Sequence, residues 1–311
     1  MSKRVLLAAP RPFCAGVDRA IEIVERLLAE HGPPIYVRHQ IVHNDHVVRR
    51  LEGMGAVFVD SEDEVPAGEI CVLSAHGVAP AVRENCERRG LRVVDAVCPL
   101  VSKVHAEARR YADSGHLVAL VGHADHVEVI GTRGERPDQT VVIESPEDAL
   151  ELDTNGKPVA VITQTTLSLD DVAETVDALA DRFGDLRRPA ADDICYATQN
   201  RQDAVKAMAG AGATLILVIG SETSSNARRL VEVAERWGAK ALLIDGESGL
   251  DPDLLEGHKT VGLTAGASTP EELVALVLRS LASLGYDELE EVEVAREDVH
   301  FRLPREVAAK A

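Results

Sequence analysis

The sequence predicts an α/β protein whose strands form mainly parallel sheets. Short apolar segments alternate with amphipathic, helix-like segments over nearly the whole 311-residue chain. Because parallel neighbours need a crossover connection, this order places helices on the faces of parallel sheets. A second observation divides the chain. Cys14, Cys98 and Cys195 each follow an apolar segment and precede a helix-like one, so we expect three α/β domains, each opened by one cysteine.

Hydrophobic periodicity locates the individual elements. Helical spacing is clearest in three stripes, within 21–28, 169–183 and 230–237, and the last stripe ends on Trp237. Thr269 is expected to cap a helix that begins at Pro270. The expected strands span 4–9, 34–38, 55–60, 69–74, 91–97, 116–122, 140–144, 158–163, 213–220, 241–245 and 259–264.

The cysteines set the expected domain boundaries. The first α/β domain covers 14–97, the second covers 98–194, and the third covers 195–283 together with 1–13. A C-terminal tail, 284–311, opens with an acidic run. Its segment 299–304 alternates apolar and polar residues, which predicts an edge strand.

Composition excludes several classes of function. The net charge is −19, from 33 basic and 52 acidic residues, which argues against nucleic acid and anionic membranes as partners. Apolar runs such as 215–219 are far shorter than a membrane span. Pro10 and Pro12 interrupt the apolar run near the start, so no signal peptide is predicted. We therefore expect a cytoplasmic protein.

The five cysteines show no C-x-x-C pair. This pattern argues against a disulfide framework, a zinc ribbon and a ferredoxin-type cluster loop. Cys71 lies within an apolar strand segment and Cys86 within a polar helical one, and both are expected to be structural. Cys14, Cys98 and Cys195 could instead meet at one point. Three thiolates on a four-iron cluster would leave one iron open to a substrate.

Polar residues follow most of the expected strands. Because the carboxyl ends of parallel strands meet at one edge of a sheet, these polar residues predict one convergent site. Serines that open helices suit a phosphate, although a simple helix cap is the structural alternative. The histidines could neutralise a diphosphate, bind a metal, or be hydrogen-bonded structural residues. Glu128 could be a proton donor or a surface residue. The candidates are His43, His76, His126, Glu128, Thr165, Ser224, Ser225, Asn226 and Ser268.

With these residues assembled, the chain resembles the IspH/LytB family of 4-hydroxy-3-methylbut-2-enyl diphosphate reductases. Val97 and Val127 depart from the threonine and proline common there, but neither is a ligand position. The matching segments are Pro12–Gly16, Val37–Asn44, Ser74–Gly77, Asp95–Val101, Gly122–Glu128, Thr163–Ser168, Asp193–Gln202, Gly220–Asn226 and Thr264–Ser268.

The resemblance implies a trefoil of three pseudo-equivalent α/β domains around a central iron–sulfur cluster. It implies that Cys14, Cys98 and Cys195 hold a [4Fe–4S] cluster, which becomes [3Fe–4S] if the open iron is lost. Glu128, His126 and Thr165 would be catalytic. The expected diphosphate ligands are His43, His76, His126, Ser224, Ser225, Asn226 and Ser268, and Thr165 would orient the substrate hydroxyl.

The implied reaction is the reductive dehydroxylation of this diphosphate to isopentenyl and dimethylallyl diphosphate, the last step of the non-mevalonate (MEP) isoprenoid pathway. The chain has no dinucleotide fingerprint or Walker loop. The two electrons that the reaction needs are therefore expected from a ferredoxin- or flavodoxin-type protein. Three alternatives stay open: an aconitase-like dehydratase, a cluster-based redox sensor, and a zinc hydrolase using Cys and His ligands.

Overall fold

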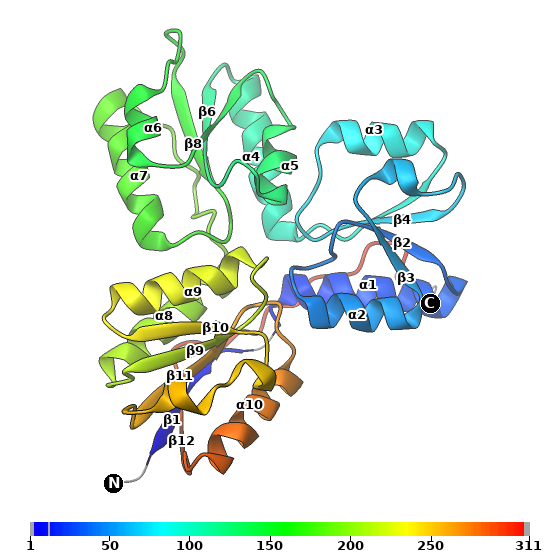
Figure 1. The fold of residues 1–311 in the computed structure, drawn as a ribbon. Coiled ribbons are helices and arrows are strands. Elements are labelled where there is room, and N and C mark those ends of the chain that lie inside the picture. Colours follow the sequence, from blue (N-terminus) through cyan, green and yellow to red (C-terminus); the bar gives the residue numbers. More distant parts are fainter. Residues whose placement is uncertain (1–2, 12, 308–311) are drawn as a thin grey trace. The chain divides into compact units, whose positions relative to one another are not determined.

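The computed structural model describes residues 3–11 and 13–307 and divides into two compact units (Figure 1). The first unit draws on Met1–Val17, His43–Val47 and Tyr196–His300. The second draws on Asp18–Val42, Val48–Cys195 and Phe301–Ala311. Every strand pairing in the described sheets is parallel, as expected for an α/β protein.

The first unit contains a five-stranded sheet with helices on both faces (Figure 1). Its strand order is β10-β9-β11-β1-β12. The strands are β1 (Arg4–Ala9), β9 (Leu215–Ile219), β10 (Lys240–Ile244), β11 (Thr260–Ala265) and β12 (Glu288–Glu293). The helices are α8 (Tyr196–Gly210), α9 (Ser225–Arg236) and α10 (Glu271–Ser283).

Strand β9 shows why this sheet is covered on both faces. All five of its residues are buried, because alternate side chains enter two different cores. Leu217 packs with Val277 of α10, whereas Val218 packs with Val205 of α8 and Leu230 of α9. The carboxyl ends of β1, β9 and β11 therefore emerge from a sheet fixed by packing on either side.

We expect Leu217→Ala to lower the free energy of unfolding by about 2–5 kcal/mol, because it leaves a cavity in a core where Leu217 is 0% exposed. Leu150→Ala is the matched control, since Leu150 is 60% exposed and should change stability by less than about 0.5 kcal/mol. Urea denaturation of the two variants checks this. Equal midpoints would contradict the packing described for β9.

The second unit contains two smaller sheets, ordered β3-β2-β4-β5 and β7-β6-β8. The four-stranded sheet comprises β2 (Ile35–Arg38), β3 (Ala56–Val59), β4 (Ile70–Leu73) and β5 (Arg92–Asp95). The three-stranded sheet comprises β6 (Leu117–Val121), β7 (Thr140–Ile143) and β8 (Val159–Thr163). Three separate parallel sheets are thus present in the described chain, in agreement with the expected fold class.

Seven helices belong mostly to this second unit. On the three-stranded sheet, Leu120 packs with Val104 of α4 on one face, and Val121 packs with Leu179 of α7 on the other. The helices are α1 (Ala15–His31), α2 (Asp45–Met54), α3 (Pro80–Arg88), α4 (Pro99–Asp113), α5 (Val127–Arg133), α6 (Pro146–Glu151) and α7 (Leu169–Phe183).

The strands expected up to residue 265 are all present with nearly the expected bounds, but the tail differs. Residues 299–304 form neither helix nor strand, so the predicted edge strand there is wrong. The acidic run instead forms β12, which pairs with β1 at the sheet edge. The residues of β12 other than the partly buried Val292 are exposed at this edge, so its glutamates stay solvated. Arg4 and Arg11 pair with Glu290 at 3.2 Å and Glu291 at 3.0 Å.

Two helix predictions also need correction. Thr269 does not cap α10, because its hydroxyl donates to the carbonyl oxygen of Ile219 at 2.9 Å and Pro270 occupies the cap position. Trp237 is 53% exposed, because it is the residue that follows α9 and has left its buried stripe. Among the described residues, no helix combines the length and the apolar character needed to cross a bilayer.

Candidate active site

The second unit places Glu128 and Thr165 in direct contact at the ends of two neighbouring strands. Glu128 lies at the start of α5, after β6, and is 2% exposed. Thr165 follows β8 and donates twice to the Glu128 carboxyl, from its backbone N–H at 2.7 Å and from its hydroxyl at 2.9 Å. Glu128 is therefore a buried group, which excludes the alternative of a surface glutamate.

Burial raises the pKa of Glu128 to about 7, although the two hydrogen bonds from Thr165 act in the opposite direction. Desolvation penalises the charged carboxylate more than these donors stabilise it. A carboxyl with this pKa holds its proton for part of the time at neutral pH and can give it up. This is the property required of a general acid.

His126 and His76 lie beside this acid. His126 caps α5, with its Nδ1 accepting the backbone N–H of Glu128 at 3.2 Å. The His76 and His126 rings have centroids 6.2 Å apart and meet edge to face. The Nδ1 atom of His76 lies 3.3 Å from the hydroxyl of Ser74. Two of the three predicted histidines, His76 and His126, thus lie together in this unit.

The segment after His76 depends on a glycine. Gly77 has a φ of +77°, in the left-handed region. A Cβ at this position would lie 2.9 Å from Nε2 of His105, whose Nδ1 pairs with Glu135 at 2.7 Å. The buried His105 ring therefore leaves no room for a side chain beside His76.

Cys98 and Cys195 are both attached to these segments through their backbone. Cys98 precedes α4, and its N–H donates to the carbonyl of Ala75 at 2.9 Å. Cys195 precedes α8, and its N–H donates to the carbonyl of Thr165 at 3.1 Å. The backbone of Cys98 is thus held at the residue before His76, and the backbone of Cys195 is held at Thr165.

The first unit gathers a second set at the ends of β1, β9 and β11. The N–H of Cys14 donates to the carbonyl of Ala267 at 3.1 Å, and the N–H of Ala267 donates to Oδ1 of Asn226 at 3.0 Å. The Ser268 hydroxyl donates to the carbonyl of His43 at 2.9 Å. The loops after β1, β9 and β11 thus bring Cys14, Asn226 and Ser268 together, and the Ser268 hydroxyl connects them to His43, which follows β2.

Ser224 and Ser225 open α9 next to Asn226. The Ser224 hydroxyl accepts the N–H of Ala227 at 3.3 Å, so this side chain is the helix cap. Ser225 begins the helix and is 3% exposed. Ser224 therefore caps α9, and the helix start that it forms is a suitable place for a phosphate.

The five cysteines fall into two groups that match the predicted division. Cys71 and Cys86 are fully buried within β4 and α3, whereas Cys14, Cys98 and Cys195 are partly accessible, and none of the five is in a disulfide. Burial raises the pKa of Cys71 to about 12, so it stays a neutral thiol. The three accessible thiols are the donor type that holds iron–sulfur clusters, and they fit such a group.

Sequence reasoning missed Arg201, a fully buried arginine near Cys14. Burial raises the pKa of Cys14, and the positive charge of Arg201 opposes that rise. Arg201 donates to the carbonyl of Ala197 and to Glu297, each at 3.0 Å. The sequence did contain a signal for this residue. Arg201 occurs at helical spacing among Ala197, Ala204 and Met208, which form the buried face of α8.

Comparisons with known proteins identify the family of the chain. The model of a family described as LytB protein matches residues 5–282. The 4-hydroxy-3-methylbut-2-enyl diphosphate reductase of Acidothermus cellulolyticus is 54% identical over 307 residues, covering 98% of this chain and 90% of that protein. The reductase of the same name from Streptomyces coelicolor is 52% identical with the same coverage.

Solved structures give the same result. The E-1-hydroxy-2-methyl-but-2-enyl-4-diphosphate reductase of Plasmodium falciparum matches with a TM-score of 0.96 and 39% identity, covering 99% of this chain and 97% of that one. A second structure, described as the terminal enzyme of the non-mevalonate pathway, matches with a TM-score of 0.64 and 31% identity, covering 90% and 99%. The chain belongs to the LytB family of 4-hydroxy-3-methylbut-2-enyl diphosphate reductases.

Proposed function

We propose that this chain reduces 4-hydroxy-3-methylbut-2-enyl diphosphate to isopentenyl and dimethylallyl diphosphate. In this reaction the bond between C4 and its hydroxyl oxygen breaks, two electrons and two protons enter, and water leaves. The observation that carries the proposal is the Glu128–Thr165 pair, a buried carboxyl with a pKa of about 7. Such a group supplies the proton that turns a poor leaving hydroxyl into water.

Cys14, Cys98 and Cys195 would hold a [4Fe–4S] cluster, which becomes [3Fe–4S] when its open iron is lost. When bound, the cluster supplies the two electrons one at a time and a Lewis-acidic iron for the substrate oxygen. The donor set supports this assignment, since three accessible free thiols are present and the two other cysteines are fully buried. The electrons would come from a ferredoxin- or flavodoxin-type protein, and the chain would work in the cytoplasm.

The diphosphate would be bound by the histidines and by the opening of α9. His43, His76 and His126 offer imidazole donors, and the first residues of α9 offer backbone N–H groups at the positive end of a helix dipole. Ser224, Ser225, Asn226 and Ser268 add polar side chains. These local donors matter because the chain carries a net charge of −19, which by itself repels an anionic substrate.

Thr165 and Glu128 would act on the substrate hydroxyl. Thr165 fixes the carboxyl through two hydrogen bonds, and its hydroxyl would also orient the hydroxyl of the substrate. Glu128 would hold the proton and deliver it to the leaving oxygen. His126, whose Nδ1 accepts the backbone N–H of Glu128, would pass protons to this pair.

We expect kcat to fall as the pH rises through about 7, the pKa of Glu128. The raised pKa means that Glu128 is protonated and active below that value, and is an ionised, inactive carboxylate above it. Well above it the rate should fall by about tenfold for each pH unit. Single-turnover rates measured across this range check the sign, and a rate that rises with pH would contradict the acid role.

We expect Gly77→Ala to raise KM for the diphosphate by about tenfold or more with a smaller change in kcat, because a displaced substrate-binding group removes binding energy. The added Cβ would collide with His105 and force a φ of +77° on alanine, which shifts the neighbouring His76. Steady-state kinetics check this. Gly90→Ala is the control, because Gly90 shares a positive φ but has open space around its Cβ position.

The proposed function is tested by an anaerobic assay on chain reconstituted with iron and sulfide. The substrate is added, and oxidation of a reduced viologen dye is followed together with the products. Dye oxidation with both five-carbon diphosphates as products supports the reductase. Protein that holds four irons and four sulfides but oxidises no dye refutes it. Dehydration of the substrate without a reductant indicates the aconitase-like dehydratase. A bound cluster without turnover indicates the redox sensor. Bound zinc without sulfide indicates the zinc hydrolase.

A further inference from the structure

A lysine on α4 makes three polar contacts with the short segment that leads to Cys195. Lys103 Nζ donates to the carbonyl of Ala191 at 2.8 Å and to the carbonyl of Asp192 at 3.1 Å. It also pairs with Oδ1 of Asp193 at 3.1 Å. Since Cys98 immediately precedes α4, this one side chain joins the helix that follows Cys98 to the segment that carries Cys195.

Asp193 continues this connection to the end of β8. Its side chain is 0% exposed, and its second oxygen, Oδ2, accepts the backbone N–H of Thr163 at 3.0 Å. Two residues further along each segment, the N–H of Cys195 donates to the carbonyl of Thr165. The segment that ends at Cys195 is thus attached to the end of β8 at Thr163, to the residues after β8 at Thr165, and to α4 through Lys103.

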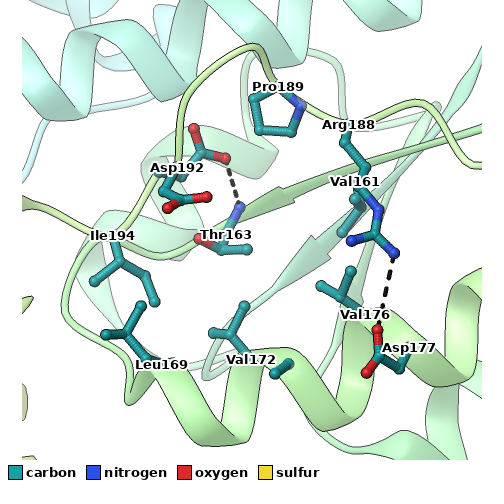
Figure 2. A pocket seen from close by; sticks show the side chains of 12 residues that line it. Val161, Thr163, Leu169, Val172, Val176, Asp177, Arg188, Pro189, Asp192 and Ile194 are labelled. Carbon is teal, nitrogen blue, oxygen red and sulfur yellow. Dashed lines mark hydrogen bonds and ion pairs between the residues drawn. The ribbon is translucent and has the colours of Figure 1, made fainter.

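A cavity borders another side of this segment, although Ile194 within it is buried, at 4% exposure. The cavity, of about 300 Å³, lies between the segment and α7, with Asp192 and Ile194 facing Leu169 and Val172 across the space (Figure 2). A side chain that lines a cavity lacks the close contacts that hold a packed residue in place. The position of the segment therefore depends on its polar contacts more than a core segment would.

Other charged side chains near Lys103 make the Lys103–Asp193 ion pair hard to replace. Glu107 also faces Lys103, at 3.9 Å, and pairs with Arg110 at 3.5 Å. Without Lys103, Asp193 would be a buried carboxylate whose cation is gone, beside a second carboxyl. Lys103 is one-third exposed but Asp193 is fully buried, so the loss of Lys103 leaves the Asp193 charge with only its hydrogen bonds to the Thr163 N–H and to Glu107, which stabilise it less than a cation does. The segment would then move toward water, and the cavity leaves room for that movement.

We propose that Lys103 and Asp193 are positioning residues that hold Cys195 in place relative to Cys98, so that both thiolates can bind one cluster. The proposal rests on the proposed function, since that function assigns the two cysteines to the cluster. Lys103 and Asp193 act through the backbone of the Cys195 segment and are not themselves ligands.

The test measures cluster loss from reconstituted full-length protein under anaerobic conditions. An iron chelator is added, and the decay of the visible cluster absorbance is followed for the wild type, Lys103→Met and Lys103→Arg. We expect Lys103→Met to lose its cluster about tenfold faster, the lower end of the effect of removing a group that supports a metal ligand. Lys103→Arg keeps the charge and should recover much of the wild-type rate.

The control separates positioning from general destabilisation. Arg38→Met breaks a comparable pair, in which Arg38 of β2 lies 2.7 Å from the buried Glu62. Thermal unfolding of the cluster-free proteins measures the stability that each substitution removes. Faster cluster loss in Lys103→Met than in Arg38→Met at similar unfolding temperatures supports the proposal, and equal rates overturn it.

Two further outcomes keep the test decisive. If Lys103→Met does not fold, Asp193→Asn replaces it, because asparagine keeps an acceptor for Thr163 but loses the attraction to Lys103. Asp193→Asn should then show the faster cluster loss, and a wild-type rate would overturn the proposal. A wild-type chain that takes up no iron and sulfide would instead refute the proposed function, and the two failures are thus distinguishable.

Discussion

Replacing Glu128 with glutamine is expected to lower kcat by about 10²–10⁴-fold, the usual contribution of a positioned general acid. Glutamine has nearly the same shape and can still accept the backbone N–H of Thr165, which bonds to Glu128 at 2.7 Å. The amide cannot supply a proton to the leaving oxygen. The substitution therefore removes the chemistry while it keeps the packing of a residue that is 2% exposed.

Three measurements separate this effect from structural damage. Iron content and thermal unfolding should match the wild type, and the loss of rate above pH 7 that is due to Glu128 should vanish in Glu128→Gln. Glu62→Gln is the matched control, because Glu62 is also buried, at 6% exposure, but lies in the short helical turn after β3 and pairs with Arg38 of β2. Full activity of Glu128→Gln would rule out the proton role.

The sequence predicted the parts of the fold that depend on hydrophobic pattern. Strand β9 reads Leu-Ile-Leu-Val-Ile, and a run buried on both faces has few alternatives to a central parallel strand. The pattern failed for β12, because an edge strand with solvated faces needs no apolar alternation. Its pairing depends on the backbone groups of β1 that do not bond to β11, and on Arg4 and Arg11, which are distant in the sequence.

The candidate site was predictable as residue types at strand ends but not as contacts. His76, Glu128 and Thr165 each follow a strand, and parallel strands bring such residues to one edge. That Thr165 donates to Glu128 twice, and that burial outweighs those bonds in setting the pKa, depends on distances that spacing does not contain. The role of Lys103 was hidden for the same reason, since an exposed helix lysine is the ordinary expectation from sequence.

Replacing Cys98 with serine is expected to leave less than about a hundredth of the wild-type activity. Removing a residue that only supports a metal ligand lowers metal affinity by about 10–100-fold, and removing a ligand itself should cost more. Serine fills the same position before α4 and keeps the backbone bond to Ala75. Its hydroxyl is a poor substitute for a thiolate toward iron. The loss should therefore appear as low iron and sulfide content, with the fold intact.

The buried cysteines provide the control that makes this prediction specific. Cys71 is fully buried, and burial raises its pKa to about 12, so it offers no thiolate at neutral pH. Cys71→Ala should lower the unfolding temperature slightly while iron content and turnover stay near wild type. Iron loss in Cys71→Ala, or a full cluster in Cys98→Ser, would show that accessibility does not distinguish the cluster ligands from the structural cysteines in this chain.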